Sequence, residues 1–185
     1  MGGTPGSENQ VFDDELDTDP PAVLNVRQFG NNQILVEFDD VMDVNACDPA
    51  NYSVDNGMVI VSLICLSDHQ VILTLGTVMT DQTIYTITVN NVSDCIGNLL
   101  ASSSSSITYY ESGAASHYDI IINEIMADPN PVVGLPEKEY IELYNRSSKT
   151  FNLEGFTIKD GSSVVCTLPF FILGPSEYIL SLIHI

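Results

Sequence analysis

The chain has 185 residues, of which 44% are hydrophobic, enough for the core of one large or two small domains. Its 25 acidic residues outnumber its 5 lysines and arginines, so the formal net charge is -20 at pH 7. This charge repels nucleic acid and anionic lipid and excludes both as partners. The longest apolar stretch, Met58 to Leu66, is too short to span a membrane, so we expect no membrane insertion.

The N-terminal region shows no secretory signal. Residues Met1 to Gly6 offer neither a basic segment nor an apolar one. We therefore expect a fragment whose signal peptide, if there is one, lies upstream. The acidic stretch Asp13 to Pro21, which ends in two prolines, is typical of a linker.

Alternating apolar and polar residues predict strands at Ile34 to Phe38, Val71 to Leu75 and Ile84 to Val89. Between Tyr52 to Val54 and Met58 to Val61 stands Asp55-Asn56-Gly57, and an Asn-Gly pair is a strong signal for a tight hairpin because both turn residues need φ > 0. The turn signals recur every 10 to 20 residues with no convincing helix between them. The pattern predicts an all-β protein built from sandwiches.

Two polar breaks divide the chain into four parts. We expect an N-terminal tail and linker at residues 1–21, a first domain at 22–111, a short linker at 112–117 and a second domain at 118–185. The five serines at Ser102 to Ser106 are interpreted as a low-complexity connector near the first boundary. Most of the acidity belongs to residues 1–111, which hold 16 acidic residues and a single base, Arg27.

Three motifs of the first domain carry a family resemblance: Asp19-Pro20-Pro21, the strand end Val36-Glu37-Phe38-Asp39, and Asp94-Cys95-Ile96-Gly97-Asn98. With these motifs the domain resembles the bacterial Ig-like domains of the surface-layer type, which are β-sandwiches. In physical terms the last motif is a turn device, because Asp94 can accept hydrogen bonds from its own turn and Gly97 permits φ > 0.

The second domain resembles the start of a lamin tail domain, also an Ig-type sandwich. The resemblance rests on Ile120 to Pro129, Glu139 to Asn145, Leu153 to Phe156 and the turn Leu173 to Pro175. The family's closing Thr-Pro-Gly tail is missing here, which implies an incomplete second domain. A similar tail stands at Gly2 to Asn9, so the resemblance implies one window of a tandem array.

Such arrays serve as stalks in secreted bacterial proteins. The resemblance therefore implies a non-catalytic extracellular spacer and adhesion scaffold, part of a large secreted or surface protein whose partners are neighbouring domains of the same polypeptide. The alternative is a carbohydrate- or protein-binding accessory module of a secreted enzyme. That alternative needs an exposed aromatic platform, for example Tyr109, Tyr110 and Tyr118.

A cluster of carboxylates in the first linker raises the question of a metal, since Ca²⁺ prefers oxygen ligands. The candidate calcium ligands are Asp13, Asp14, Glu15, Asp17 and Asp19. The alternative is a solvated, self-repelling linker, because the loop pattern of an EF-hand is absent. A second acidic cluster, Asp39, Asp40 and Asp43, is interpreted as a solvated loop.

We expect no catalytic residues and, apart from the calcium question, no cofactor. Four carboxylates of the second domain could in principle act as acid and base, but no nucleophile or histidine stands near them in sequence. These carboxylates are Glu124, Asp128, Glu139 and Glu142.

The cysteines and the chain end complete the predictions. A disulfide should join two of Cys47, Cys65 and Cys95, and the sequence does not choose between the pairings. The fourth cysteine, Cys166, belongs to the second domain. The last residues, Leu180 to Ile185, look like a translated sequencing adaptor, so we expect the native second domain to stop near Ile179.

Overall fold

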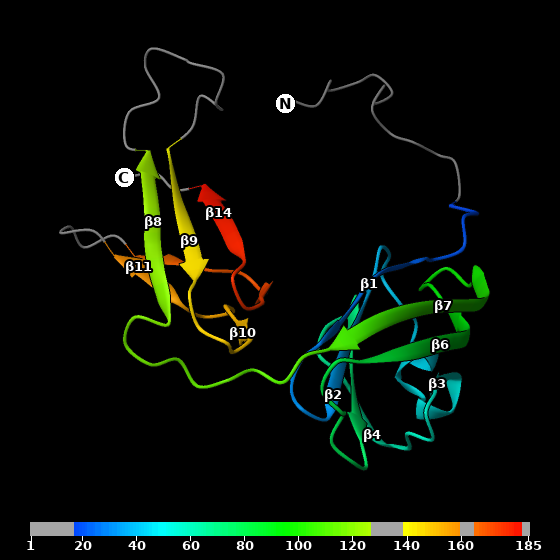
Figure 1. The fold of residues 1–185 in the computed structure, drawn as a ribbon. Coiled ribbons are helices and arrows are strands. Elements are labelled where there is room, and N and C mark those ends of the chain that lie inside the picture. The colour runs from blue at the N-terminus through cyan, green and yellow to red at the C-terminus, as the bar shows by residue number, and fades with distance from the viewer. Residues whose placement is uncertain (1–16, 127–138, 160–164, 183–185) are drawn as a thin grey trace, which may run out of the picture. The chain divides into compact units, whose positions relative to one another are not determined.

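A computed structural model describes residues 17–126, 139–159 and 165–182 (Figure 1). The chain is all-β, with antiparallel sheets, and it divides into two compact units. Unit 1 comprises residues 1–79 and 84–107, and unit 2 comprises 80–83 and 108–185. Among the described residues, no helix is long and apolar enough to cross a membrane.

Two antiparallel sheets form unit 1. One has the strand order β1-β2-β5-β4 and the other the order β3-β6-β7. The strands are β1 (Val23–Gln28), β2 (Gln33–Phe38), β3 (Tyr52–Val54), β4 (Ile60–Cys65), β5 (Gln70–Leu75), β6 (Thr83–Ser93) and β7 (Leu99–Tyr109), with the short 3-10 helices η1 (Val44–Cys47) and η2 (Pro49–Asn51) between β2 and β3.

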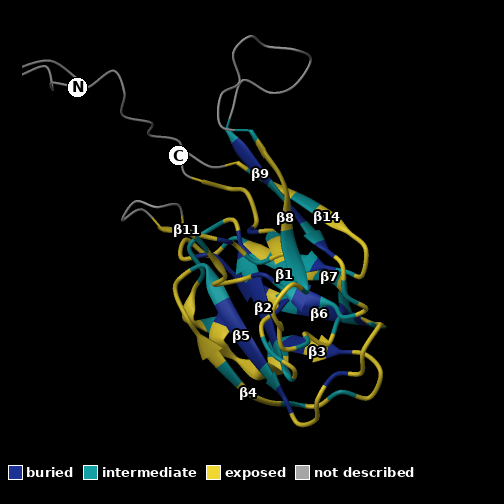
Figure 2. Cartoon of the chain, turned by 60° about the vertical axis from the view of Figure 1, so that its left-hand side comes forward, coloured by how far each residue is buried: buried dark blue, intermediate teal, exposed yellow. Residues whose placement is uncertain are grey.

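The predicted alternation appears in the core of unit 1. Tyr85, Ile87 and Val89 of β6 are buried, while the threonines between them are only half-buried. In β2 and β5 the burial goes further, because Leu35 and Ile72, on the outer face, are also buried and stand opposite each other in the register. Figure 2 shows the resulting dark segments along both strands.

The Asn-Gly turn forms as predicted, but the hairpin does not. Asn56 and Gly57 have φ values of 57° and 71°, and Met58 N–H donates to Asp55 C=O at 3.1 Å. However, β3 pairs with β6 and β4 pairs with β5, so the turn leads from one sheet to the other. The reason lies in contacts to β6: Asp55 Oδ1 accepts from Thr86 N–H and Asn56 Nδ2 donates to Ile84 C=O.

The serine run is a strand and not a connector, which corrects the prediction for Ser102 to Ser106. All five residues belong to β7. Their outward hydroxyls meet polar side chains of β6: Ser104 Oγ lies 3.0 Å from Thr88 Oγ1, and Ser106 Oγ lies 3.2 Å from Thr86 Oγ1. Composition alone misleads here, because a run of serines is typical of a linker, whereas a serine hydroxyl can also pair with a threonine on the neighbouring strand.

Unit 2 is built from shorter strands in three small sheets, with the orders β14-β9-β8, β10-β13 and β11-β12. Its core is formed by the buried side chains of Ile141, Leu143, Phe151, Leu153, Leu168 and Leu173. The strands are β8 (Ile120–Met126), β9 (Tyr140–Asn145), β10 (Phe151–Asn152), β11 (Thr157–Lys159), β12 (Val165–Thr167), β13 (Ile172–Leu173) and β14 (Tyr178–Leu182).

The end of the chain contributes to this unit. Leu180 stands opposite Glu142 and Leu182 stands opposite Tyr140, so the first residues of the predicted adaptor segment pair with β9. Residues 183–185 lie outside the described residues. The adaptor origin of residues 180–185 stays a prediction.

A disulfide joins Cys47 of η1 to Cys65 of β4, with a Cα–Cα distance of 5.8 Å. This confirms that two of the first three cysteines pair. Cys95 is free and exposed, and Cys166 is free and half-buried. The disulfide ties the connection between the two sheets of unit 1 to an outer strand.

Candidate cation site

Asp94 is the centre of the most polar buried turn in unit 1. Its side chain is 0% exposed. Oδ1 accepts hydrogen bonds from the backbone N–H groups of Ile96, Gly97 and Asn98 at 2.9, 2.6 and 2.8 Å, and Oδ2 accepts from Asn98 Nδ2 at 2.7 Å. Gly97 has φ 103°, the conformation that the motif requires.

These contacts hold Asp94 in the ionised form. Burial raises the pKa of the Asp94 carboxyl, but the hydrogen bonds from Asn98, Gly97 and Ile96 outweigh it, and the pKa lies below its ordinary value. The turn therefore contains a fixed negative charge that the solvent does not reach.

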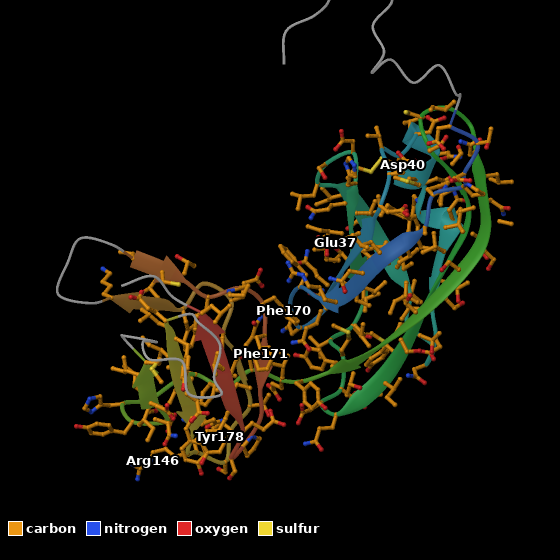
Figure 3. The ribbon with its side chains drawn as sticks, turned by 90° about the horizontal axis from the view of Figure 1, so that it is seen from above. Glu37, Asp40, Arg146, Phe170, Phe171 and Tyr178 are labelled. Atoms are coloured by element: carbon orange, nitrogen blue, oxygen red, sulfur yellow. A yellow bond between two sulfur atoms is a disulfide. The ribbon has the colours of Figure 1, made fainter. Side chains whose placement is uncertain are left out.

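Two further carboxylates approach this charge. Asp17, Asp40 and Asp94 each offer an oxygen, and these oxygens lie within 4.8 Å of one another. Asp40 comes close because the bridge between Met42 and Asp94 brings the loop after β2 against the turn. Asp17 comes close because Asn98 Nδ2 also donates to the Asp17 C=O at 3.1 Å. Asp40 is labelled in Figure 3.

The structure distributes the predicted calcium ligands unevenly. Asp13, Asp14 and Glu15 lie outside the described residues. Asp17 joins the group just defined, and the backbone N–H of Asp19 donates to Asp17 Oδ1 at 3.0 Å, while the Asp19 carboxylate is not part of the group. Only one of the five residues is thus placed at a cluster in the described part of the chain.

The three residues of the second acidic cluster, Asp39, Asp40 and Asp43, make different contacts. Asp39 Oδ1 accepts from Ala22 N–H at 2.7 Å and fastens the start of β1. Asp43 caps η1 by accepting from Val44 N–H. Asp39 and Asp43 are exposed, as expected of a solvated loop, and each also accepts a hydrogen bond from a backbone N–H group.

Three carboxylates at this separation repel one another in the absence of a counter-charge, and a hard cation with oxygen ligands could relieve the repulsion. Asp94 is the member that sequence reasoning missed as a ligand. Its sequence motif indicates only a turn. The sequence does not show that this turn packs against the loop after β2, which carries Asp40.

The carboxylates of unit 2 behave differently. Glu124 and Glu142 stand opposite each other on β8 and β9, and Asp128 lies outside the described residues. Tyr140 Oη donates to Glu124 Oε1 at 2.7 Å, and Asn123 Nδ2 donates to Glu142 Oε1 at 2.6 Å. The hydrogen bond to Glu124 is the main reason that the pKa of Tyr140 is raised.

The aromatic platform suggested by the sequence does not exist in the form predicted. Tyr109 is only 4% exposed and is part of the core, whereas Tyr118 is 63% exposed and its ring centroid lies 3.8 Å from that of His117. Tyr109 is therefore not accessible to a ligand, and Tyr110, the third residue of the predicted platform, is half-buried.

Part of unit 2 is similar to a known protein family. The family model of the lamin tail domain matches residues 113–181, as the sequence resemblance indicated. No curated protein matches the chain.

Among solved structures, the chain is similar to two of the bacterial surface layer protein SbsC. A structure of its domains 1-6 is 16% identical, with a TM-score of 0.48, over 85% of this chain and 26% of that one. A crystal structure of its N-terminal part is 19% identical, with a TM-score of 0.48, over 85% of this chain and 44% of that one. The present chain thus spans less than half the length of either.

Proposed function

We propose that the chain is a non-catalytic extracellular spacer and scaffold segment of a larger secreted or surface protein. The observation that carries this proposal is that the predicted linker, residues 112–117, is hydrogen-bonded to Lys149, Thr150 and Asn152 and so forms part of unit 2. A spacer transmits position and force best when the chain between its modules is not slack.

The attachment is made by backbone and side-chain contacts. Gly113 N–H donates to Thr150 C=O at 2.9 Å, and Asn152 N–H donates to Ser112 Oγ at 2.9 Å. Lys149 Nζ donates to Ala114 C=O at 3.1 Å and to Asp119 Oδ2 at 2.8 Å. The Asp119 pKa is lowered, chiefly by its hydrogen bond to Lys149.

Limited proteolysis tests the attachment. A glutamate-specific protease can cut after Glu111, at the start of the attached segment. In Lys149→Met, cleavage after Glu111 should become several-fold faster, because the ammonium group no longer holds Ala114 and Asp119. The matched control is Lys159→Met on the exposed strand β11, which should cut at the wild-type rate. Equal cleavage in all three proteins would remove the basis of the proposal.

The spacer function itself needs a test on cells. An epitope displayed beyond the two units on a bacterial surface should lose antibody access when both units are deleted and regain it when an unrelated rigid spacer of similar length replaces them. Rescue by the unrelated spacer separates a spacing role from a binding role. A panel of nuclease, esterase, glycosidase and peptidase substrates should show no turnover, and turnover that disappears in Glu142→Gln would contradict the proposal.

Calcium binding is a second candidate role, favoured by the group of Asp17, Asp40 and Asp94. A cation bound there would hold the end of the acidic linker against the turn that contains Asp94. The calcium prediction thereby moves from the linker alone to a site shared by the linker and the first unit.

A further inference from the structure

One face of the three-stranded sheet of unit 2 combines tyrosines with carboxylates. Residues that stand opposite each other in a sheet share a face, and so do residues two apart along a strand. The register places Tyr144 opposite Tyr178, and Glu142 opposite both Glu124 and Leu180. These side chains belong to the face opposite Ile141 and Leu143, which point into the core.

The two tyrosines form a stacked pair. Their ring centroids lie 4.4 Å apart with an interplanar angle of 23°. Tyr178 is 53% exposed, so its ring is accessible to a ligand; it is labelled in Figure 3. Within the described residues the cation–π contact is between Arg27 and Phe29 of unit 1.

The two glutamates beside the tyrosines have an unfavourable arrangement. Like charges directly opposite on neighbouring strands destabilise a sheet. The hydrogen bonds from Tyr140 and Asn123 each occupy one carboxylate oxygen. Among the described residues neither Glu124 nor Glu142 forms an ion pair.

We propose that this face, defined by Glu124, Glu142, Tyr144 and Tyr178, binds a lysine or arginine side chain of a basic protein segment. Residues two apart along a strand are separated by roughly 7 Å, so one guanidinium or ammonium group can reach a carboxylate while its stem lies on a tyrosine ring. The proposal goes beyond the spacer function, because it assigns a ligand-binding surface.

Charge complementarity favours this occupant over the other candidates. A cation neutralises the two facing carboxylates, whereas a neutral glycan leaves their repulsion in place. A second copy of the chain carries the same net charge of -20 and would be repelled at long range.

The test uses the full chain and the peptide acetyl-Thr-Arg-Thr-Arg-Thr-amide, whose arginines share one side when it is extended. Its partner peptide has citrulline at both arginine positions, which keeps the shape and removes the charge. Calorimetry should show weak binding of the arginine peptide, and Glu124→Gln/Glu142→Gln should weaken it about tenfold or more. The control Glu111→Gln/Glu154→Gln removes the same charge away from the face and should weaken binding less than about twofold.

A second variant isolates the aromatic contribution. Tyr178→Leu keeps an apolar side chain of strand-compatible shape and should weaken binding roughly threefold or more, the size of an exposed cation–π contact. Thermal unfolding of every variant must match that of the wild type, so that a loss of binding is not a loss of fold. Chemical shifts of the Tyr178 ring should move on addition of the arginine peptide and stay fixed with the citrulline peptide.

Several results would overturn the proposal. Equal weakening by the two double variants would show that the peptide responds only to net charge. Equal binding of the citrulline peptide would show apolar docking, and absence of any binding would remove the site. Binding of a neutral oligosaccharide, or self-association of the chain, that is lost in Tyr178→Leu and kept in Glu124→Gln/Glu142→Gln would assign the face to that ligand instead.

Discussion

In each of the two units a buried polar side chain hydrogen-bonds the backbone of a turn, but the side chain is a carboxylate in one unit and an amide in the other. Each has a polar side chain that is 0% exposed: Asp94 in unit 1 and Asn145 in unit 2. Asp94 only accepts, and it gathers three backbone N–H groups on one oxygen. Asn145 donates to the C=O groups of Lys149, Leu173 and Gly174, and its Oδ1 accepts from Ser147.

The difference shows what each turn demands. A turn that presents only N–H groups inward is best satisfied by a carboxylate, which carries several acceptor sites on two atoms. A site where carbonyls and N–H groups meet needs an amide, which offers both. The first solution makes unit 1 sensitive to acid, and the second leaves unit 2 without such a titration at its centre.

The largest expected effect concerns Asn145. Asn145→Ala leaves several buried carbonyl and N–H groups without partners, so the free energy of unfolding of unit 2 should fall by roughly 3 kcal/mol or more. Denaturant unfolding followed by NMR signals of unit 2 measures this. Asn152→Ala is the control, because the half-buried Asn152 side chain accepts one hydrogen bond, from Glu154 N–H. A similar loss in both variants would refute a special role for Asn145.

Removing the disulfide should affect unit 1 alone. Cys47 and Cys65 are separated by 18 residues, and Cys47→Ser/Cys65→Ser should lower the free energy of unfolding of unit 1 by about 3 kcal/mol, mainly by releasing the unfolded chain. Cys95→Ser, at the free cysteine of the same unit, should leave stability unchanged. The prediction is wrong if the double variant lowers the free energy of unfolding of unit 2 or leaves that of unit 1 unchanged.

The acid sensitivity of unit 1 follows from the lowered pKa of Asp94. The stabilisation is complete above the unfolded pKa of about 3.9 and is lost as the pH falls below it toward the folded pKa. Asp94→Asn should lower the melting temperature of unit 1 at pH 7 by roughly 5 °C and flatten its dependence on pH below about 4. Asp55→Asn, at a surface acceptor, should keep the wild-type pH profile. A profile unchanged in Asp94→Asn would show that other carboxylates cause the acid response.

The smallest expected effect is that of Ca²⁺. At a free concentration ten times the dissociation constant, one site in unit 1 adds roughly 1.4 kcal/mol to its stability. The melting shift should vanish in Asp17→Asn/Asp40→Asn and persist in Asp19→Asn. If Asp19→Asn abolishes it and Asp17→Asn/Asp40→Asn does not, the linker binds calcium without the turn. Absence of any shift at millimolar Ca²⁺ contradicts the calcium role.

Residue patterns revealed the all-β class because alternation in segments such as Ile84 to Val89 reflects burial directly. They missed which strands pair: Asn56-Gly57 has the turn conformation expected of a hairpin, but Asp55 binds Thr86 of another sheet, and such long-range bonds leave no local signal. The site is similar. Asp17 is a candidate from the sequence, whereas Asp94 meets it through the hydrogen bond from Asn98 Nδ2 to the Asp17 C=O, which forms only in the folded chain.

The serine hydroxyls of β7 that pair with threonine hydroxyls of β6 do not by themselves fix the register of the two strands. From Ser102 to Ser106 every position is identical, so sliding β7 by two residues would exchange one serine for another and cost these hydroxyl pairs little. The correct alignment must therefore be enforced by the end of the strand, beyond the boundary of unit 1 at residue 107, where Tyr109 is buried and its C=O accepts from Gln82 N–H. We expect misaligned pairings of this strand to compete with the native one during folding, and Tyr109→Ala should populate them.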